Sequence, residues 1–135
     1  LTMNSSISAQ ITEYLLKELE AEVIVLFGSV VSGCFREDSD VDIAFLSSKD
    51  VSEYDLYILA QALAQEIGRE VDLVDLKKAS TVLKAQIIGK GKCIYVKDKS
   101  KFAEFRIRAL KEYSLLNEER APIFEAISRR GKVYG

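Results

Sequence analysis

A run of five apolar residues, Val23-Ile-Val-Leu-Phe27, constrains the fold of this chain more than any other stretch. The run is short, rich in β-branched side chains and ended by Gly28, a combination typical of a strand buried on both faces. Such a strand needs other elements packed against its sheet. The run is also far shorter than the roughly 20 residues that a membrane span requires. With no leader-like amino terminus in the sequence, we expect no membrane segment and a cytoplasmic protein.

The spacing of apolar residues predicts helices and further strands on either side of this run. Between the first strand and residue 40 the chain is polar, and we expect a loop with at most a short helical turn. After residue 97 it is helical to the end, with a break at Pro122. The remaining expected elements are helices at 7–19, 52–67 and 80–89 and strands at 40–46, 71–76 and 93–96. This pattern predicts one α/β domain over residues 1–135, a small mixed β-sheet with flanking helices, with a core at about 22–97 and a helical extension at about 99–135.

Gly28-Ser29, ten further residues and then Asp40-Val41-Asp42 form the motif that carries chemistry. Residues two apart on a strand face the same side with Cα atoms about 6.6 Å apart, so the two carboxylates can converge on cations roughly 3.5 to 4 Å from each other. Gly28 lets the backbone approach a ligand closely, and Ser29 adds a hydroxyl beside main-chain N–H groups. The motif therefore predicts a site for a triphosphate and paired magnesium ions.

A third carboxylate is expected from the segment Val71-Asp-Leu-Val-Asp-Leu76. Alternation along a strand sends Asp72 and Asp75 to opposite faces, so only one of them can join the pair. We expect Asp72, because an unpaired carboxylate among apolar neighbours in mid-strand would cost several kcal/mol unless it served a metal. Asp75, near the strand end, is expected to be solvated or to cap the following turn.

Composition narrows the chemistry further. The 135 residues contain no histidine, which excludes Ser-His-Asp and Cys-His nucleophilic systems and histidine-ligated zinc. Any catalysis must rest on carboxylates, hydroxyls, lysine, arginine or the backbone. A net charge of -2 argues against direct nucleic-acid binding by broad phosphate neutralisation.

The motif also carries a family resemblance. Gly-Ser, then Asp-x-Asp, then Val-Asp-Leu-Val about thirty residues later resembles the minimal nucleotidyltransferase domains of the DNA polymerase β-like superfamily over about residues 22–97. Residues 71–83 are further similar to the MNT antitoxins of HEPN/MNT toxin–antitoxin pairs. The resemblance implies a polymerase β-like fold and an adenylyltransferase that uses ATP and two Mg²⁺ ions. It also implies a HEPN-domain toxin as partner, silenced by transfer of AMP to one of its tyrosines.

Residue roles follow from the resemblance by position. Gly28 and Ser29 would hold the β- and γ-phosphates. Asp40 and Asp42 would bind both metal ions, and Asp72 would complete one metal site and assist deprotonation of the tyrosine.

The loop between Ser29 and Asp40 adds two residues and one departure. Arg36 and Ser39 fall where the family often has an arginine and a serine, so they are expected near the nucleotide phosphates. Many members also carry arginine just after Gly-Ser, where this chain has Val30-Val-Ser32. Phosphate contacts in this loop must therefore be fewer or come from Arg36.

Two other functions remain open at this point. The same catalytic core would serve a small-molecule transferase, of the kind that modifies aminoglycosides, if a helical partner chain held the acceptor. A non-catalytic antitoxin that neutralises its toxin by binding alone is the other alternative. In each case we expect Ile123 and Phe124, beyond the break at Pro122, to contribute to an interface with the partner or with a second copy of this chain.

Overall fold

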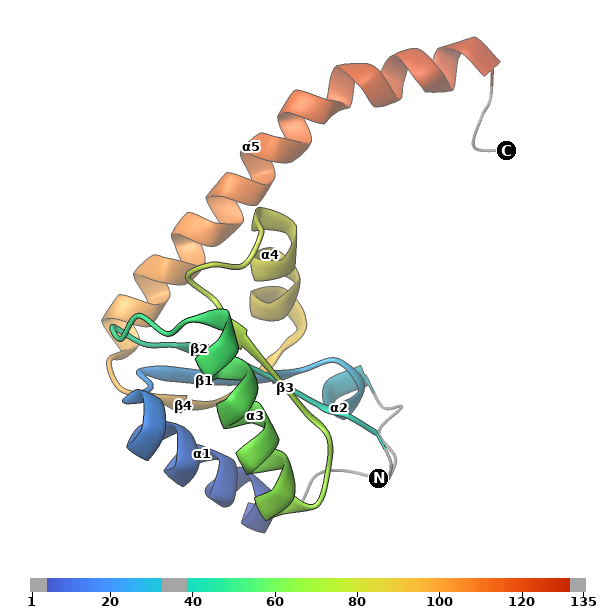
Figure 1. Cartoon of the computed structure of the whole chain (residues 1–135). Helices are drawn as coiled ribbons and strands as arrows, with labels where there is room; N and C mark the ends of the chain where they lie inside the picture. The colour runs from blue at the N-terminus through green and yellow to red at the C-terminus, as the bar shows by residue number, and fades with distance from the viewer. Residues whose placement is uncertain (1–4, 33–38, 132–135) are drawn as a thin grey trace.

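A computed structural model describes the backbone of residues 5–32 and 39–131 and the side chains of residues 6–31 and 39–118 (Figure 1). The mixed sheet expected from the sequence is confirmed. Its strand order is β3-β2-β1-β4, with β1 antiparallel to both neighbours and β2 parallel to β3. In chain order the elements are α1 (Ser5–Leu19), β1 (Val23–Phe27), α2 (Ser29–Ser32), β2 (Val41–Leu46), α3 (Glu53–Ile67), β3 (Val71–Asp75), α4 (Thr81–Lys90), β4 (Lys92–Val96) and α5 (Lys99–Gly131).

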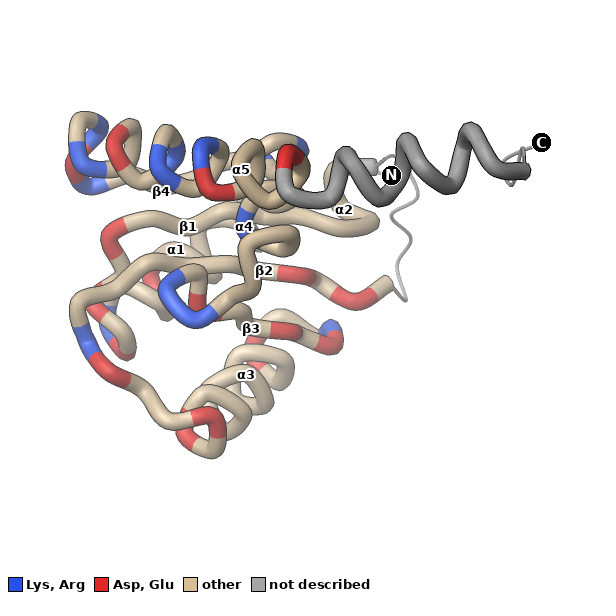
Figure 2. The backbone as a smooth tube through the Cα atoms, turned by 90° about the horizontal axis from the view of Figure 1, so that it is seen from above, with Lys and Arg blue, Asp and Glu red and all other residues tan. Residues whose placement is uncertain are grey.

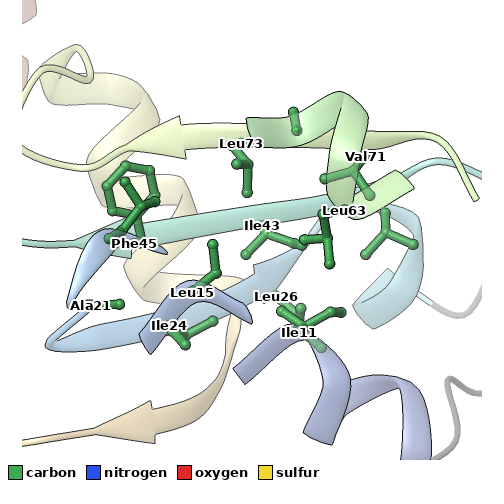
Figure 3. Close-up of a cluster of buried hydrophobic side chains, with 13 residues drawn as sticks. Ile11, Leu15, Ala21, Ile24, Leu26, Ile43, Phe45, Leu63, Val71 and Leu73 are labelled. Atoms are coloured by element: carbon green, nitrogen blue, oxygen red, sulfur yellow. The ribbon is translucent and has the colours of Figure 1, made fainter. Parts of the chain in front are cut away.

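Helices α1 and α3 cover one face of the sheet and enclose the larger part of the core. Ile11 and Leu15 of α1 and Leu63 of α3 are fully buried against the sheet (Figure 3). Every second residue of β2 meets them, among them Ile43 and Phe45. Apolar burial of this kind contributes roughly 25 cal/mol per Å² of surface removed from water, so this layer is the main source of stability.

A smaller apolar cluster lies on the other face, beneath α4 and the beginning of α5. Val25 and Ala44 contribute from the sheet, Ile87 from α4 and Phe102 from α5. The run Val23–Phe27 therefore supplies side chains to both clusters, as its composition predicted. Because this second layer is incomplete, the end of β2 nearest α2 keeps polar side chains on that face.

Helix α3 connects two parallel strands, and local signals in the sequence set both of its ends. The hydroxyl of Ser52 accepts the N–H of Asp55 at 3.1 Å, which caps the first turn. At the other end Gly68 adopts a left-handed conformation and donates its N–H to the carbonyl of Ala64 at 2.9 Å. The chain then enters β3, which pairs with β2 in parallel.

The break expected at Pro122 is wrong: α5 is helical from Lys99 to Gly131. A proline inside a helix removes one backbone hydrogen bond and crowds the preceding turn, which bends a helix without having to end it. Figure 1 shows the axis of α5 changing direction in its second half, beyond the body of the sheet. The side chains of Ile123 and Phe124 lie outside the described residues, so the interface expected there stays a prediction.

No helix in the described part of the chain combines the length and hydrophobicity that crossing a membrane requires.

Candidate active site

Strands β2 and β3 bring the predicted carboxylates to one end of the sheet. Asp42 lies opposite Phe27 of β1 on one side and opposite Asp72 of β3 on the other. Because Val41 and Ile43 fill the face under α1 and α3, Asp42 points to the α4 and α5 face. Asp72 occupies the matching position of β3 and faces the same way. Asp42 and Asp72 are therefore direct neighbours across parallel strands. Figure 2 shows acidic segments side by side on β2 and β3.

Gly28 is packed directly against Asp42. It has φ +74°, in the region that favours glycine, and a Cβ placed on it would overlap Oδ2 of Asp42 and lie 3.1 Å from its Cγ. The carboxylate thus occupies the space that any other residue would fill. Gly28, which was predicted to let a ligand approach the backbone closely, therefore also leaves space for the carboxylate of Asp42.

Ser29 begins the single-turn helix α2, which confirms the short helical turn expected in this segment. Its hydroxyl donates a long hydrogen bond, 3.5 Å, to the main-chain carbonyl of Asp40. Asp40 itself is exposed and directly precedes β2, so the strand begins one residue later than predicted. Ser29, Asp40 and Asp42 therefore lie together at the end of β1 and the start of β2.

The carboxylates repel one another. Partial burial raises the pKa of Asp42, and the negative charges of Asp72 and then Asp40 raise it further. A site that holds three like charges close together is stabilised by a cation, because the cation converts that repulsion into attraction.

The donor set fits Mg²⁺, which prefers oxygen ligands and is commonly held by one or two carboxylates together with substrate phosphates. Within the described ranges, no three acidic or cysteine side chains are close enough to enclose an ion by themselves. Water or the phosphate oxygens of a nucleotide would therefore supply the remaining ligands.

Asp75 differs in part from the expectation. It points to the opposite face from Asp72, as predicted, but it is buried and not solvated, because that face is covered by α3. Its Oδ1 accepts the N–H of Lys77 at 2.9 Å, so the predicted capping role is confirmed. Its Oδ2 has no hydrogen-bond partner in the described structure.

The structure describes one of the two loop residues expected near phosphate. Ser39 is half-buried beside Asp40 and lines a small cavity with Gly68 and Arg69, at the start of β3. Arg36 lies outside the described residues, so its contact with phosphate stays a prediction.

A cavity of about 710 Å³ opens next to Gly28, between the end of β1 and α4. The sequence did not predict it, because Leu83 and Ile87 follow the ordinary helical spacing of core residues. Only the tertiary packing shows that α4 stands away from the end of β1 and leaves this space. Its lining consists of Phe27, Gly28, Val31, Leu83, Gln86, Ile87 and Lys90.

Comparison with known proteins relates this chain to nucleotide-transferring enzymes. Residues 9–100 match the model of the family described as polymerase beta, nucleotidyltransferase. The chain is 36% identical over 108 residues to the protein adenylyltransferase MntA of Shewanella oneidensis, and the match covers 78% of this chain and 76% of that protein.

Solved structures of toxin–antitoxin proteins are also similar to this chain. The crystal structure of a toxin–antitoxin with AMP-PNP superposes with a TM-score of 0.80 at 32% identity, covering 88% of this chain and 96% of the other. A complex of the tri-AMPylated Shewanella oneidensis HEPN toxin with its MNT antitoxin superposes with a TM-score of 0.78 at 30% identity, covering 93% and 98%.

Proposed function

This chain belongs to the polymerase beta nucleotidyltransferase family, and we propose that it is a protein adenylyltransferase that transfers AMP from ATP to a tyrosine hydroxyl of a HEPN-domain toxin. One observation carries the proposal: Asp42 and Asp72 are paired across parallel strands, with Gly28 packed against Asp42. The 36% identity to a protein adenylyltransferase supports the choice of a protein acceptor.

The reaction is an in-line displacement at the α-phosphorus of ATP. The tyrosine oxygen forms a new bond to that phosphorus while the bond to the bridging oxygen breaks, and pyrophosphate leaves. The tyrosine proton must be accepted as this happens. Asp72 is exposed at the rim of the site, where a partner's hydroxyl could reach it, and we assign it this role.

The other residues hold the nucleotide. The backbone at Gly28 and the hydroxyl of Ser29 are suited to contact phosphate oxygens, because no side chain at Gly28 blocks the approach. The neighbouring cavity is large enough for a nucleoside, and its apolar lining suits a base.

Metal ions would be held by Asp40 and Asp42, with Asp72 completing one of two Mg²⁺ sites. When bound, such ions make an attacking hydroxyl more acidic and neutralise triphosphate charge. The raised pKa of Asp42 supports this assignment, because repulsion among the acids leaves the site in need of positive charge.

The acceptor is expected to come from another chain. A relative with 30% identity is found with the AMPylated HEPN toxin itself. This observation favours a protein acceptor over an aminoglycoside-type substrate.

Replacing Asp42 with asparagine tests the proposal. With labelled ATP, Mg²⁺ and a co-purified HEPN-domain toxin, Asp42→Asn should lower the rate of label transfer by at least about 100-fold, because a charged ligand at the reacting centre is lost. The matched control is Asp50→Asn, an exposed surface residue that pairs with Lys78 and should transfer at the wild-type rate. Circular dichroism should show both variants folded.

Two results would contradict the proposal. Transfer by Asp42→Asn within about threefold of wild type would remove this residue from the reaction. If the wild-type protein and Asp42→Asn neutralised the toxin equally and neither transferred label, the chain would be a non-catalytic antitoxin that acts by binding alone.

A further inference from the structure

Another cavity lies on the same sheet face, at the opposite end of β2 from Asp42. We propose that this cavity, here called the basic cavity, binds the oligophosphate group of a small anion, either inorganic pyrophosphate or the phosphates of a nucleotide, without using the acids of the candidate active site. Its volume is about 320 Å³. Its lining consists of Leu46, Lys77, Lys84, Phe105, Arg108, Ala109 and Glu112.

The three cations of the basic cavity form no ion pair with an acid of the described residues. The nearby surface pairs are Lys49 with Glu20 and Lys78 with Asp50, and neither involves the cavity. Lys77 donates to the main-chain carbonyl of Lys49 at 2.9 Å, which holds its position without neutralising its charge. The lining of the cavity therefore carries three cations against one acid.

Lys84 is the most enclosed of the three cations. It is half-buried on α4, with its ammonium 5.9 Å from the ring centre of Phe105 on α5, whereas Lys77 and Arg108 are exposed. An aromatic face attracts an ammonium without neutralising its charge. Because Lys77 and Arg108 line the same cavity, a bound anion would relieve the repulsion among the three cations.

Size and shape favour a small ligand. Leu46, Phe105 and Ala109 give the basic cavity an apolar floor, and its volume is at the lower end of the range for small-molecule sites. Glu112 is the single acidic residue of its lining, and it is exposed.

An adjoining cavity shows why the anion is assigned to the basic one. It shares Lys77 and Arg108 and adds Lys101, but it is also lined by an equal number of acidic residues, namely Glu22, Asp98 and Glu104. These acids offset its cations, and Lys84 is not part of its lining. An excess of positive charge is therefore found only in the basic cavity of the two.

The basic cavity is separate from the candidate active site. Asp42 and Leu46 are four residues apart on β2, or about 13 Å along a strand. Helix α4 stands between them, with Leu83 and Ile87 facing the cavity at Gly28 and Lys84 facing the basic one. Anion binding there goes beyond the proposed function and does not depend on it.

Calorimetric titration of the full chain with sodium pyrophosphate in EDTA tests the site. Without metal ions the acids at Asp42 should repel phosphate, so we expect saturable binding of one pyrophosphate that Asp42→Asn does not weaken. Lys84→Met, which keeps the stem over Phe105, and Arg108→Gln should each lower the affinity by about tenfold, as is typical for loss of a charge-assisted contact. The matched control is Arg106→Gln, on the same helix but stacked on Phe102 outside the cavity, and it should bind normally.

A second titration with ATP in EDTA distinguishes the two sources of oligophosphate. Equal affinities would assign the site to the phosphates alone, and tighter ATP binding would assign it to a nucleotide. No saturable binding of either compound, or an equal loss of affinity in Arg106→Gln, would overturn the proposal. Melting curves of each variant establish that a loss of binding is not a loss of fold.

Discussion

The two ends of β2 carry opposite charges on one face of the same sheet. Negative charge is concentrated where the strand begins, at Asp42 and its neighbours, and Figure 2 shows acidic residues on β2 and β3 at this end. Where the strand ends, the lining of the basic cavity carries three cations and one acid. The acidic end is built almost entirely from strand residues and one glycine. The basic end draws on a turn after β3, on α4 and on α5.

This difference determines how rigidly each end is held. The positions of Asp42 and Asp72 follow from backbone pairing, so their separation is fixed by the sheet. The cations of Lys77, Lys84 and Arg108 sit on long side chains from separate elements, and their positions depend on helix packing. We therefore expect substitutions at the acidic end to act mainly on chemistry, and substitutions at the basic end to act on affinity.

The largest effect is expected from Gly28→Ala, which should disrupt the arrangement of residues at the acidic end of β2. A methyl group here would displace the carboxylate of Asp42 and force alanine into a left-handed conformation. We expect AMP transfer to fall by at least about 1000-fold, because both the phosphate approach and the position of a metal ligand are lost. The measurement is the labelled-ATP assay with toxin.

Gly68→Ala is the control for this substitution. Gly68 has φ +71°, and no atom lies within 4 Å of the position that a Cβ would take, so alanine there carries the backbone strain alone. It should lower the free energy of unfolding by about 1 kcal/mol and leave transfer unchanged. If both variants lost activity equally, backbone strain and not the crowding of Asp42 would explain the effect.

A smaller effect separates the two acids of β3. Asp72→Asn should lower transfer by about 100-fold, because it removes the residue assigned to accept the tyrosine proton. Asp75→Asn should stay within about threefold of wild type, since Asp75 is buried on the other face and caps the turn at Lys77. Activity measured under saturating ATP distinguishes them, and the reverse order would show that the wrong face was assigned to the site.

The acidic end was predictable from sequence because strand alternation and motif spacing are local properties. They were sufficient to place Asp42 and Asp72 on one face and Asp75 on the other. The burial of Asp75 was not predictable, since a strand-end position does not reveal that α3 covers it. The fold class followed from the same patterns.

The basic end was not predictable in this way. The spacing of Lys77 and Lys84 is typical of a solvated helix face, and Arg108 lies outside the resemblance to the family. Only packing of α4 against α5 brings them to one cavity. The continuation of α5 past Pro122 was missed for a related reason. A proline disfavours helix at its own position, but the sequence does not show whether the remaining hydrogen bonds of the helix outweigh that local cost.

The smallest predicted effect concerns stability and pH in the absence of metal. Because the pKa of Asp42 is raised in the folded state, its ionisation opposes folding, and the loss of stability develops as pH rises from the usual aspartate pKa through the raised one. Asp42→Asn should therefore melt about 1 to 2 °C above wild type at pH 7, a small shift because the side chain is partly exposed.

The difference should largely vanish near pH 3, where the aspartate is mostly protonated in both states. Thermal unfolding in EDTA at both pH values measures it. A variant that is less stable than wild type at pH 7 would show that the carboxylate is stabilised in the folded protein, contrary to the repulsion among the acids.

The parallel pairing of β2 with β3 has a consequence for how this chain avoids misfolding. A slip of one residue along β3 would turn Asp72 into the apolar layer at Leu63 and expel Val71 and Leu73 from it. Burying that charge without a partner would cost several kcal/mol, a large part of the roughly 5 to 15 kcal/mol that stabilises a typical domain. Misaligned forms are therefore selected against during folding, before any nucleotide is bound.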